Sequence, residues 1–309
     1  MIVAEERTRA VDSQAASRPT SGSALRWLQH GKLALLPSYF AATWPLRWAY
    51  SRWLKGQGRV PILVLALHRV ADDTATSWTT HTDAFRRKVD WLRKRFDLVS
   101  LEEAQRRISS PVNDRPTVSI TFDDGYSENC RDALPLLLRH KIPFTYFITS
   151  DPVLRGSYFQ HDLRLGLQLP PNTVGQLREL AGAGVEIGAH TRTHADLGAI
   201  HDPRRLHDEV VVAREELQSA LDCRIRYFAF PYGRHENLNP QVFQLAADAG
   251  YEAVVSAYGG YNFPGDDAFH MQRPCVDGAV TRVKHWAMPD PCRQRNLRRF
   301  QYREATTPL

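Results

Sequence analysis

The sequence predicts an α/β fold built around a parallel β-sheet, because strand-like and helix-like segments alternate along most of its 309 residues. The strand signals are apolar runs of strand length, such as PILVLAL at residues 61–67 and TVSITF at 117–122. The helix signals are apolar stripes, and in the clearest one Phe85, Val89 and Leu92 recur at the spacing of one helical face. Repeated strand–helix units predict a parallel sheet, either open or closed into a barrel.

The alternation continues along the chain to about residue 256. In a parallel sheet the reactive residues gather beyond the C-terminal ends of the strands, so candidate functional residues are sought there. Further strands are predicted at residues 144–149, 185–189, 227–230 and 251–256, and further helices at 129–140, 174–183, 206–221 and 242–249.

Composition divides the chain into four parts. Residues 1–24 are rich in Ser, Thr, Ala and Arg and are predicted to be disordered, and residues 25–58 form an apolar-aromatic arm. The sequence Gly-Gln-Gly at 56–58 breaks the chain before the main α/β domain, which extends over residues 59–280. Residues 281–309 are polar and basic, and we expect a tail that either touches anionic lipid or stays solvated.

The arm bears on where the protein acts. Its apolar stretch, residues 33–50, contains two prolines and Arg47, whereas a membrane-spanning helix needs about 20 uninterrupted apolar residues. Two interpretations stay open: the arm packs on the domain, or it lies on a membrane surface among Arg52 and Lys55. The polar N-terminus has no apolar run behind it, so no cleavable signal peptide is expected. We therefore expect a cytoplasmic protein, with peripheral contact to the inner membrane face as an open alternative.

Charge and cysteine content limit the classes of partner. The 40 Lys and Arg residues against 34 acidic residues give a net charge of +6, which fits a mildly basic solvated surface or an anionic partner. No basic helix with interleaved aromatic residues appears within the core, so nucleic acid is not expected as a partner. The four cysteines lack C-x-x-C spacing, which argues against a disulfide framework or a zinc–thiolate site and fits a reducing compartment.

Two adjacent carboxylates, Asp123 and Asp124, directly follow the predicted strand at 117–122 in the sequence TFDDGY. Successive side chains of an extended segment point in different directions, so one Asp can bind a metal while the other faces a water molecule as a base. Gly125 follows where the backbone must turn sharply. On its own, the motif fits equally well a turn whose Asp residues cap the following helix.

A histidine pair follows the predicted strand at 185–189. His190 and His194 are four residues apart and would share a face on a helical turn, which suits two-point binding of zinc or a similar ion. On their own they are equally compatible with capping or surface histidines, since the chain contains 12. With Asp124 they make an Asp-His-His set with open coordination positions, which is typical of a catalytic metal site.

Two further motifs end predicted strands. The sequence YFAFPYG at residues 227–233 ends in a turn whose backbone N–H groups can stabilise an oxyanion and whose aromatic ring, Tyr232, can line a sugar subsite. An ordinary strand-to-turn corner would have the same sequence. His68 follows the strand at 61–67 in the sequence LHRV, where a lone histidine is more often structural than catalytic.

Together, TFDDGY, the sequence HTRTH beginning 66 positions after Asp124, and FPYG resemble the polysaccharide deacetylase family, the NodB or chitooligosaccharide deacetylase homology domain. The resemblance covers about residues 60–278. It implies a distorted (β/α) barrel with one divalent metal ion, zinc above all, with cobalt or nickel also suited to such ligands. It also implies that Asp123 is the general base and that Asp124, His190 and His194 bind the metal.

The resemblance extends to the substrate side of the site. It implies that the backbone N–H of Tyr232 helps to hold the oxyanion. We expect Pro231, Tyr232 and Tyr126 to contact the substrate. Residues 157–162 and 256–262 resemble members encoded in exopolysaccharide loci and are expected to shape the substrate site.

The sequence departs from the family pattern in two places. Its third motif lacks the Arg that many members carry, and no convincing Leu-x-His motif supplies a general acid near the C-terminus. In a circularly permuted branch, the biofilm poly-N-acetylglucosamine deacetylases, that histidine follows the first strand in a Y-H-x-V context, which the sequence around His68 resembles. His68 is therefore the candidate general acid, in preference to His270 or His285.

The implied activity is metal-dependent hydrolysis of an N-acetyl or other N-acyl group from an amino sugar in a polysaccharide, oligosaccharide or glycolipid, for example in exopolysaccharide biosynthesis. Two alternatives stay open. The aromatic arm and basic tail suggest a deacylase of a lipid-linked sugar at the cytoplasmic membrane face. The other alternative is a glycan-binding protein on an inactive deacetylase fold, against which the complete set of Asp and His residues argues.

Overall fold

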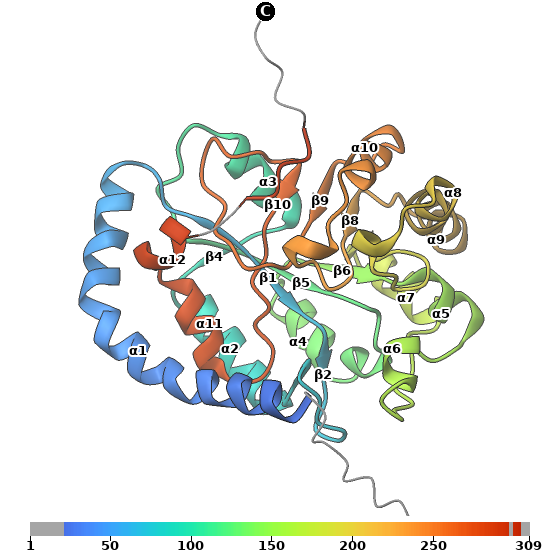
Figure 1. Ribbon diagram of the computed structural model, residues 1–309, viewed down its shortest axis with the longest axis horizontal. Coiled ribbons are helices and arrows are strands. Elements are labelled where there is room, and N and C mark those ends of the chain that lie inside the picture. Colours follow the sequence, from blue (N-terminus) through green and yellow to red (C-terminus); the bar gives the residue numbers. More distant parts are fainter. Residues whose placement is uncertain (1–21, 297–298, 304–309) are drawn as a thin grey trace, which may run out of the picture. The chain divides into compact units, whose positions relative to one another are not determined.

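The computed structural model describes residues 22–296 and 299–303, so most of the segment predicted to be disordered lies outside the described residues (Figure 1). The chain divides into two units, residues 1–42 and 43–309. In the first unit the described residues belong to helix α1 (Gly22–Gly56), which continues into the second unit. Among the described residues, no helix is both long and apolar enough to cross a membrane.

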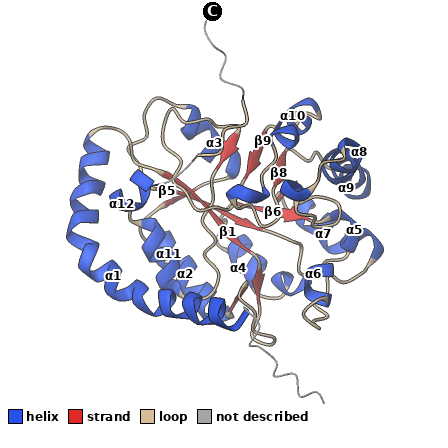
Figure 2. Ribbon diagram, in the orientation of Figure 1, coloured by secondary structure: helices blue, strands red, loops and turns tan. Residues whose placement is uncertain are grey.

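The second unit is built on a sheet of eight strands whose pairings are all parallel (Figure 2). Seven strands follow one another in the order β1-β5-β6-β7-β8-β9-β10, and β4 pairs with the start of β5. The fully buried strands β1 and β5 pair along their whole length, which makes them the centre of the core. The strands are β1 (Ile62–Leu67), β4 (Asp97–Leu98), β5 (Thr117–Phe122), β6 (Phe144–Ile148), β7 (Glu186–Ala189), β8 (Tyr227–Ala229), β9 (Ala253–Val255) and β10 (His270–Met271).

The sheet curves into a nearly closed barrel. The chain beyond β10 lies beside β1, where the Ala66 N–H donates to the Pro274 carbonyl and the Val276 N–H donates to the Ala66 carbonyl. A regular ladder does not form here, because β10 ends after two residues and only an isolated bridge joins Ala66 to Cys275. The prediction of a distorted (β/α) barrel is therefore confirmed.

Helices surround these strands, as the blue ribbons of Figure 2 show. Helix α2 buries Phe85, Val89 and Leu92, the stripe expected from the sequence. A separate pair of two-residue strands, β2 (Arg69–Val70) and β3 (Thr79–Thr80), lies just beyond β1. The helices are α2 (Thr82–Arg93), α3 (Leu101–Ser109), α4 (Ala133–Arg139), α5 (Ser150–Arg155), α6 (Gln160–Leu163), α7 (Val174–Gly182), α8 (Pro203–His207), the π-helical turn Asp208–Val212, α9 (Ala213–Leu221), α10 (Pro240–Asp248), α11 (Val280–Ala287) and α12 (Pro291–Asn296), with 3₁₀ turns at Ser127–Cys130, Leu197–Ala199 and His235–Asn237.

The C-terminal segment differs from the solvated tail that its basic composition suggested. It contains α11 and α12, and both Val283 and Asp290 are buried. Asp290 forms an ion pair with Arg47 of α1, which is also buried. The described residues 281–296 therefore pack on the barrel: Val283 and Ala287 are buried, and Arg293 lies over the Trp286 ring.

Gly188 in β7 imposes a tight packing constraint close to the C-terminal end of the barrel. A Cβ atom at this position would lie 2.4 Å from the Phe147 ring on the neighbouring strand β6. We expect Gly188→Ala to lower the free energy of unfolding by about 1–3 kcal/mol, as overpacked core substitutions do. Denaturant unfolding measures the change.

Gly182→Ala at the end of α7 is the matched control, because nothing lies within 4 Å of the added Cβ. It should change stability by less than about 0.5 kcal/mol. Equal stability of the two variants would contradict the packing described for Gly188.

Candidate active site

The polar motifs lie beyond the C-terminal ends of neighbouring strands, where the sequence placed them. His68 follows β1, Asp123 and Asp124 follow β5, and His190 follows β7. Backbone hydrogen bonds fix these positions beside one another: the Asp123 N–H donates to the Leu67 carbonyl at 2.9 Å, and the His190 N–H donates to the Ile148 carbonyl at 2.8 Å. The loops are thus extensions of the parallel ladders.

Asp124, His190 and His194 converge on one point. The Asp124 Oδ1 atom lies 3.4 Å from the His190 Nε2 atom and 3.1 Å from the His194 Nε2 atom. One potential ligand atom from each residue lies within 4.8 Å of the other two. The structure therefore brings together the three residues that the motifs predicted as metal ligands.

The chemistry of these atoms fits a divalent ion. The His190 Nδ1 atom lies 2.9 Å from the Ala229 carbonyl oxygen, which can only accept a hydrogen bond. The N–H is therefore on Nδ1, and the lone pair is on Nε2, facing Asp124. The buried Asp124 Oδ1 has no hydrogen-bond partner among the described residues. Lone pairs gathered without a donor repel one another unless a cation lies between them. Two imidazoles and one carboxylate are the ligand set of many catalytic zinc sites.

A loop holds the two histidines, and not the helical turn that their spacing suggested. Thr191 and His194 both adopt left-handed backbone, with φ angles of 60° and 61°, which excludes a right-handed helical turn. The Thr191 Oγ1 atom accepts the His194 N–H at 3.0 Å. The Glu209 carboxylate, on the π-helical turn, accepts the N–H groups of Arg192 and Thr193. These bonds offset the strain of about 1–3 kcal/mol that each non-glycine residue in left-handed backbone stores.

Asp123 faces a buried arginine that sequence reasoning missed. Arg273 donates from Nη1 to Oδ1 at 2.7 Å and from Nη2 to Oδ2 at 2.8 Å, and its side chain is fully buried. Burial raises the pKa of Asp123, but the charge and hydrogen bonds of Arg273, together with the neighbouring His190 and His68, outweigh burial and hold this pKa below its ordinary value. Arg273 follows β10. The third motif, after β8, lacks the arginine that many family members carry, and here the arginine comes from the segment after a different strand.

His68 faces a buried carboxylate that was also missed. Asp277 Oδ2 lies 2.7 Å from His68 Nδ1, and Asp277 Oδ1 accepts the His68 backbone N–H at 3.1 Å. Burial lowers the pKa of His68, but Asp277 outweighs burial through its charge and its hydrogen bond, so this pKa lies well above its ordinary value. The His68 Nε2 atom remains for other partners.

A buried lysine is linked to the His68–Asp277 pair through Thr80. Lys88 of α2 is 1% exposed and donates to the Val276 carbonyl and to Thr80 Oγ1. Thr80 Oγ1 also accepts the Gly278 N–H at 2.9 Å, so its own hydrogen is directed to Asp277 Oδ1 at 3.5 Å. Burial lowers the pKa of Lys88 to about 8, and the Asp277 charge opposes this shift.

His68, Asp277 and Tyr232 border a cavity of about 570 Å³. Tyr232 at its wall is 47% exposed, has a φ of 59°, and packs its ring 5.0 Å from the His194 ring. Among the described residues no acceptor pairs with the Tyr232 backbone N–H. The lining is mostly polar and includes two aromatic rings: His68, Ser77, Trp78, Asp196, Tyr232, Arg234, Glu236, Asn237, Ala257, Cys275, Asp277 and Arg282.

Two of the residues predicted to contact the substrate do not reach this cavity. Tyr126 is fully buried, and its hydroxyl donates to Asp162 Oδ2 at 2.9 Å and bonds His161 at 3.0 Å. Pro231 is buried as well. Their motifs identified the right loops, but whether a loop residue points to the cavity or to the core depends on packing from distant segments. His161, from the segment expected to shape the site, lies with its ring 4.3 Å from the His194 ring.

The two other histidines considered for the acid role lie elsewhere. His270 bonds Ser256 Oγ at 2.9 Å and packs against Phe243. His285 contacts the buried Arg47. Neither lines this cavity, whereas His68 does.

Comparison with known sequences supports the same family. A sequence model described as polysaccharide deacetylase matches residues 111–254. A chitooligosaccharide deacetylase of Bradyrhizobium sp. (strain ANU 289) is 31% identical over 182 residues, covering 58% of this chain and 70% of that protein. A putative polysaccharide deacetylase of Bacillus subtilis (strain 168), YxkH, is 24% identical, covering 67% of this chain and 68% of that protein.

Solved structures share the fold. IcaB from Ammonifex degensii superimposes with a TM-score of 0.60 at 25% identity, covering 74% of this chain and 97% of that one. The Streptococcus pyogenes deacetylase PplD, solved with acetate, gives a TM-score of 0.63 at 20% identity, covering 75% and 100%. Because the Bradyrhizobium enzyme is matched at 31% identity over 70% of its length, this chain belongs to the polysaccharide deacetylase family and is a hydrolase of amide bonds.

Proposed function

We propose that the protein removes the N-acetyl group of an amino sugar within an oligosaccharide or polysaccharide, with one divalent ion held by Asp124, His190 and His194. The observation that carries the proposal is the buried Asp124 Oδ1 atom, which faces the His190 Nε2 lone pair, lies 3.1 Å from His194 Nε2 and has no hydrogen-bond partner assigned among the described residues. A glycan-binding protein on an inactive fold would have no use for such a set beside an acid and a base.

A divalent ion bound at this site would supply Lewis-acid chemistry, since it lowers the pKa of a water molecule and polarises an amide carbonyl. Asp123 would accept the proton of the attacking water. Each of its oxygens bonds one N–H of Arg273 and keeps a lone pair, so the carboxylate is fixed in orientation and stays ionised near neutral pH. Arg273 therefore acts as a positioning residue.

His68 would donate a proton to the departing sugar amine. Asp277 binds the ring at Nδ1, which leaves Nε2 as the donor, and it keeps the ring protonated near neutral pH by raising its pKa. The Tyr232 N–H would bind the oxygen of the tetrahedral intermediate. The cavity between these groups has both polar and aromatic walls, and sugars present hydroxyl groups and apolar ring faces that match such walls.

The proposal is tested by measuring acetate release from N-acetylhexosamine oligomers and from lipid-linked N-acetyl sugars, with and without a chelator. We expect release from the oligomers, at least a hundredfold loss after chelation, and recovery when zinc, cobalt or nickel is added back. Release that survives complete removal of metal would contradict the proposed site.

Asp123→Asn separates the base from the metal ligands. We expect the rate of acetate release to fall by about 10²–10⁴-fold, the range that general-base catalysis contributes, while one metal ion per chain remains bound. Metal content and turnover are measured on the same sample, and thermal unfolding shows whether the variant is folded. Asp90→Asn, on the exposed side of α2, is the carboxylate control and should change neither quantity. Loss of the metal would instead make Asp123 a ligand.

Asp277→Asn tests how His68 is tuned. The acid is active in its protonated form, below its pKa, and Asp277 raises that pKa. Removing the charge should lower the pKa of His68, so the alkaline limb of the rate–pH profile should move to lower pH. The profile of kcat against pH measures this shift. An unchanged alkaline limb with a uniformly lower rate would show that Asp277 only supports the structure.

A further inference from the structure

A second cavity, of about 280 Å³, lies at the opposite end of the barrel from the catalytic groups. Val60 and Pro61, which precede β1, and Pro116, which precedes β5, line it together with Ala287 at the end of α11 and Pro289 beyond it. The catalytic residues follow the same two strands. Since β1 has six residues and a strand rises about 3.3 Å per residue, the two ends are about 20 Å apart.

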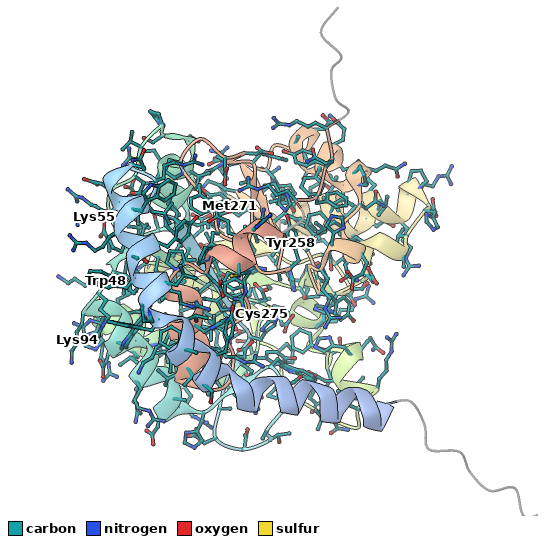
Figure 3. The ribbon with its side chains drawn as sticks, turned by 60° about the vertical axis from the view of Figure 1, so that its left-hand side comes forward. Trp48, Lys55, Lys94, Tyr258, Met271 and Cys275 are labelled. Atoms are coloured by element: carbon teal, nitrogen blue, oxygen red, sulfur yellow. The ribbon has the colours of Figure 1, made fainter. Side chains whose placement is uncertain are left out.

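Helix α1 supplies the outer wall of this second cavity. Trp48, Arg52 and Lys55 line it from the helix, and Arg95 and Phe96 line it from the segment after α2. Figure 3 shows Trp48 and Lys55 on the outer side of the helix, with Lys94 on the same side of the molecule. The lining is thus an apolar floor with a cationic rim, and none of its residues is acidic.

The cations of this rim form no ion pair within the described structure, although Arg95 donates an N–H to the Trp91 carbonyl at 3.4 Å. No carboxylate pairs with Arg52, Lys55 or Arg95 among the described residues. Arg52 lies 5.2 Å above the Trp48 ring, and Arg95 lies 5.0 Å above the Trp91 ring. An arginine stacked on an exposed indole presents its remaining N–H donors outward, where they can bind an anion.

The two flanks of the helix differ in what surrounds them. Arg47 and Leu54 form its buried face, while Trp48 is 50% exposed and Trp53 is 57% exposed. Five residues at 100° each place Trp48 and Trp53 roughly 140° apart around the helix, so only Trp48 borders the cationic cavity. Trp53 therefore offers an equally exposed indole without the cavity.

We propose that this cavity and its rim dock the protein on a bilayer that contains anionic phospholipid. The argument is charge complementarity combined with shape: an acyl chain fits the apolar floor, phosphate groups match the three cations, and an indole at the rim suits the interface between the two. Docking in this way leaves the catalytic cavity, at the other end of β1 and β5, open to a glycan.

The test is co-sedimentation of the full chain with vesicles of phosphatidylcholine alone or mixed with phosphatidylglycerol. We expect binding that needs phosphatidylglycerol and weakens with salt. Arg52→Gln with Lys55→Gln should weaken binding at least about tenfold, since each cation near an anionic surface contributes about fivefold. The control is the double variant Arg204→Gln with Arg205→Gln on α8. It removes the same two positive charges from the net charge of +6 and should have little effect on vesicle binding.

Trp48→Ala should also weaken vesicle binding severalfold, whereas Trp53→Ala should leave it within about twofold of the original. All four variants should keep their activity on soluble N-acetylhexosamine oligomers, so the docking test is independent of the proposed function. Equal binding to both vesicle types, or equal losses for Trp48→Ala and Trp53→Ala, would overturn the proposal. So would absence of vesicle binding with concentration-dependent dimerisation through this surface.

Discussion

The buried ion pair between Arg273 and Asp123 is the interaction on which the rest of the site depends. Removing one partner of such a pair leaves an uncompensated buried charge, which costs about 3–5 kcal/mol. The pair joins the chain after β10 to the end of β5, so the charges are satisfied only when the last strand returns to the first part of the sheet. The same return brings Asp277, four residues later, to His68. Closure of the barrel and assembly of the proposed acid and base therefore have one structural cause.

The buried charge of Asp277 explains why a lysine, Lys88, lies close to the His68–Asp277 pair. Asp277 is almost completely buried, and in the proposed mechanism His68 releases its proton during turnover, so this imidazole alone would not neutralise Asp277 at every step. Lys88 lies nearby and is linked to Asp277 through the Thr80 hydroxyl, so a second positive charge stays close when His68 is neutral. Lys88 also binds the Val276 carbonyl, which fixes the backbone next to Asp277. The lysine thus stabilises both the charge and the position of the group that tunes the acid.

The sequence predicted those parts of the molecule whose signals are local. Strand and helix periodicity predicted the parallel sheet, the family resemblance implied the barrel, and the motifs after β5 and β7 identified Asp124, His190 and His194, which the structure brings together. Arg273 and Asp277 had no local signal, because β10 is two residues long and its partners lie far away in the sequence. Tyr126 was expected to contact the substrate, and its buried position could not be predicted for a related reason. The direction of its side chain depends on Asp162, which a separate segment supplies. Long-range pairing of polar groups is the information that one sequence does not display.

The two ends of this parallel barrel differ in chemistry: polar groups gather after the strands, and apolar residues gather before them. The loops after the strands are free to carry polar groups, because the ladder ends there and the side chains no longer pack in the core. The segments before the strands here are apolar, and they meet the last turns of α1 and the residues after α11. Substitutions at one end therefore act through different contacts from those at the other, since the packed core of β1 and β5 lies between them. An anchoring surface can change at the N-terminal ends of the strands while the catalytic geometry, held by Arg273 and Asp277, stays intact.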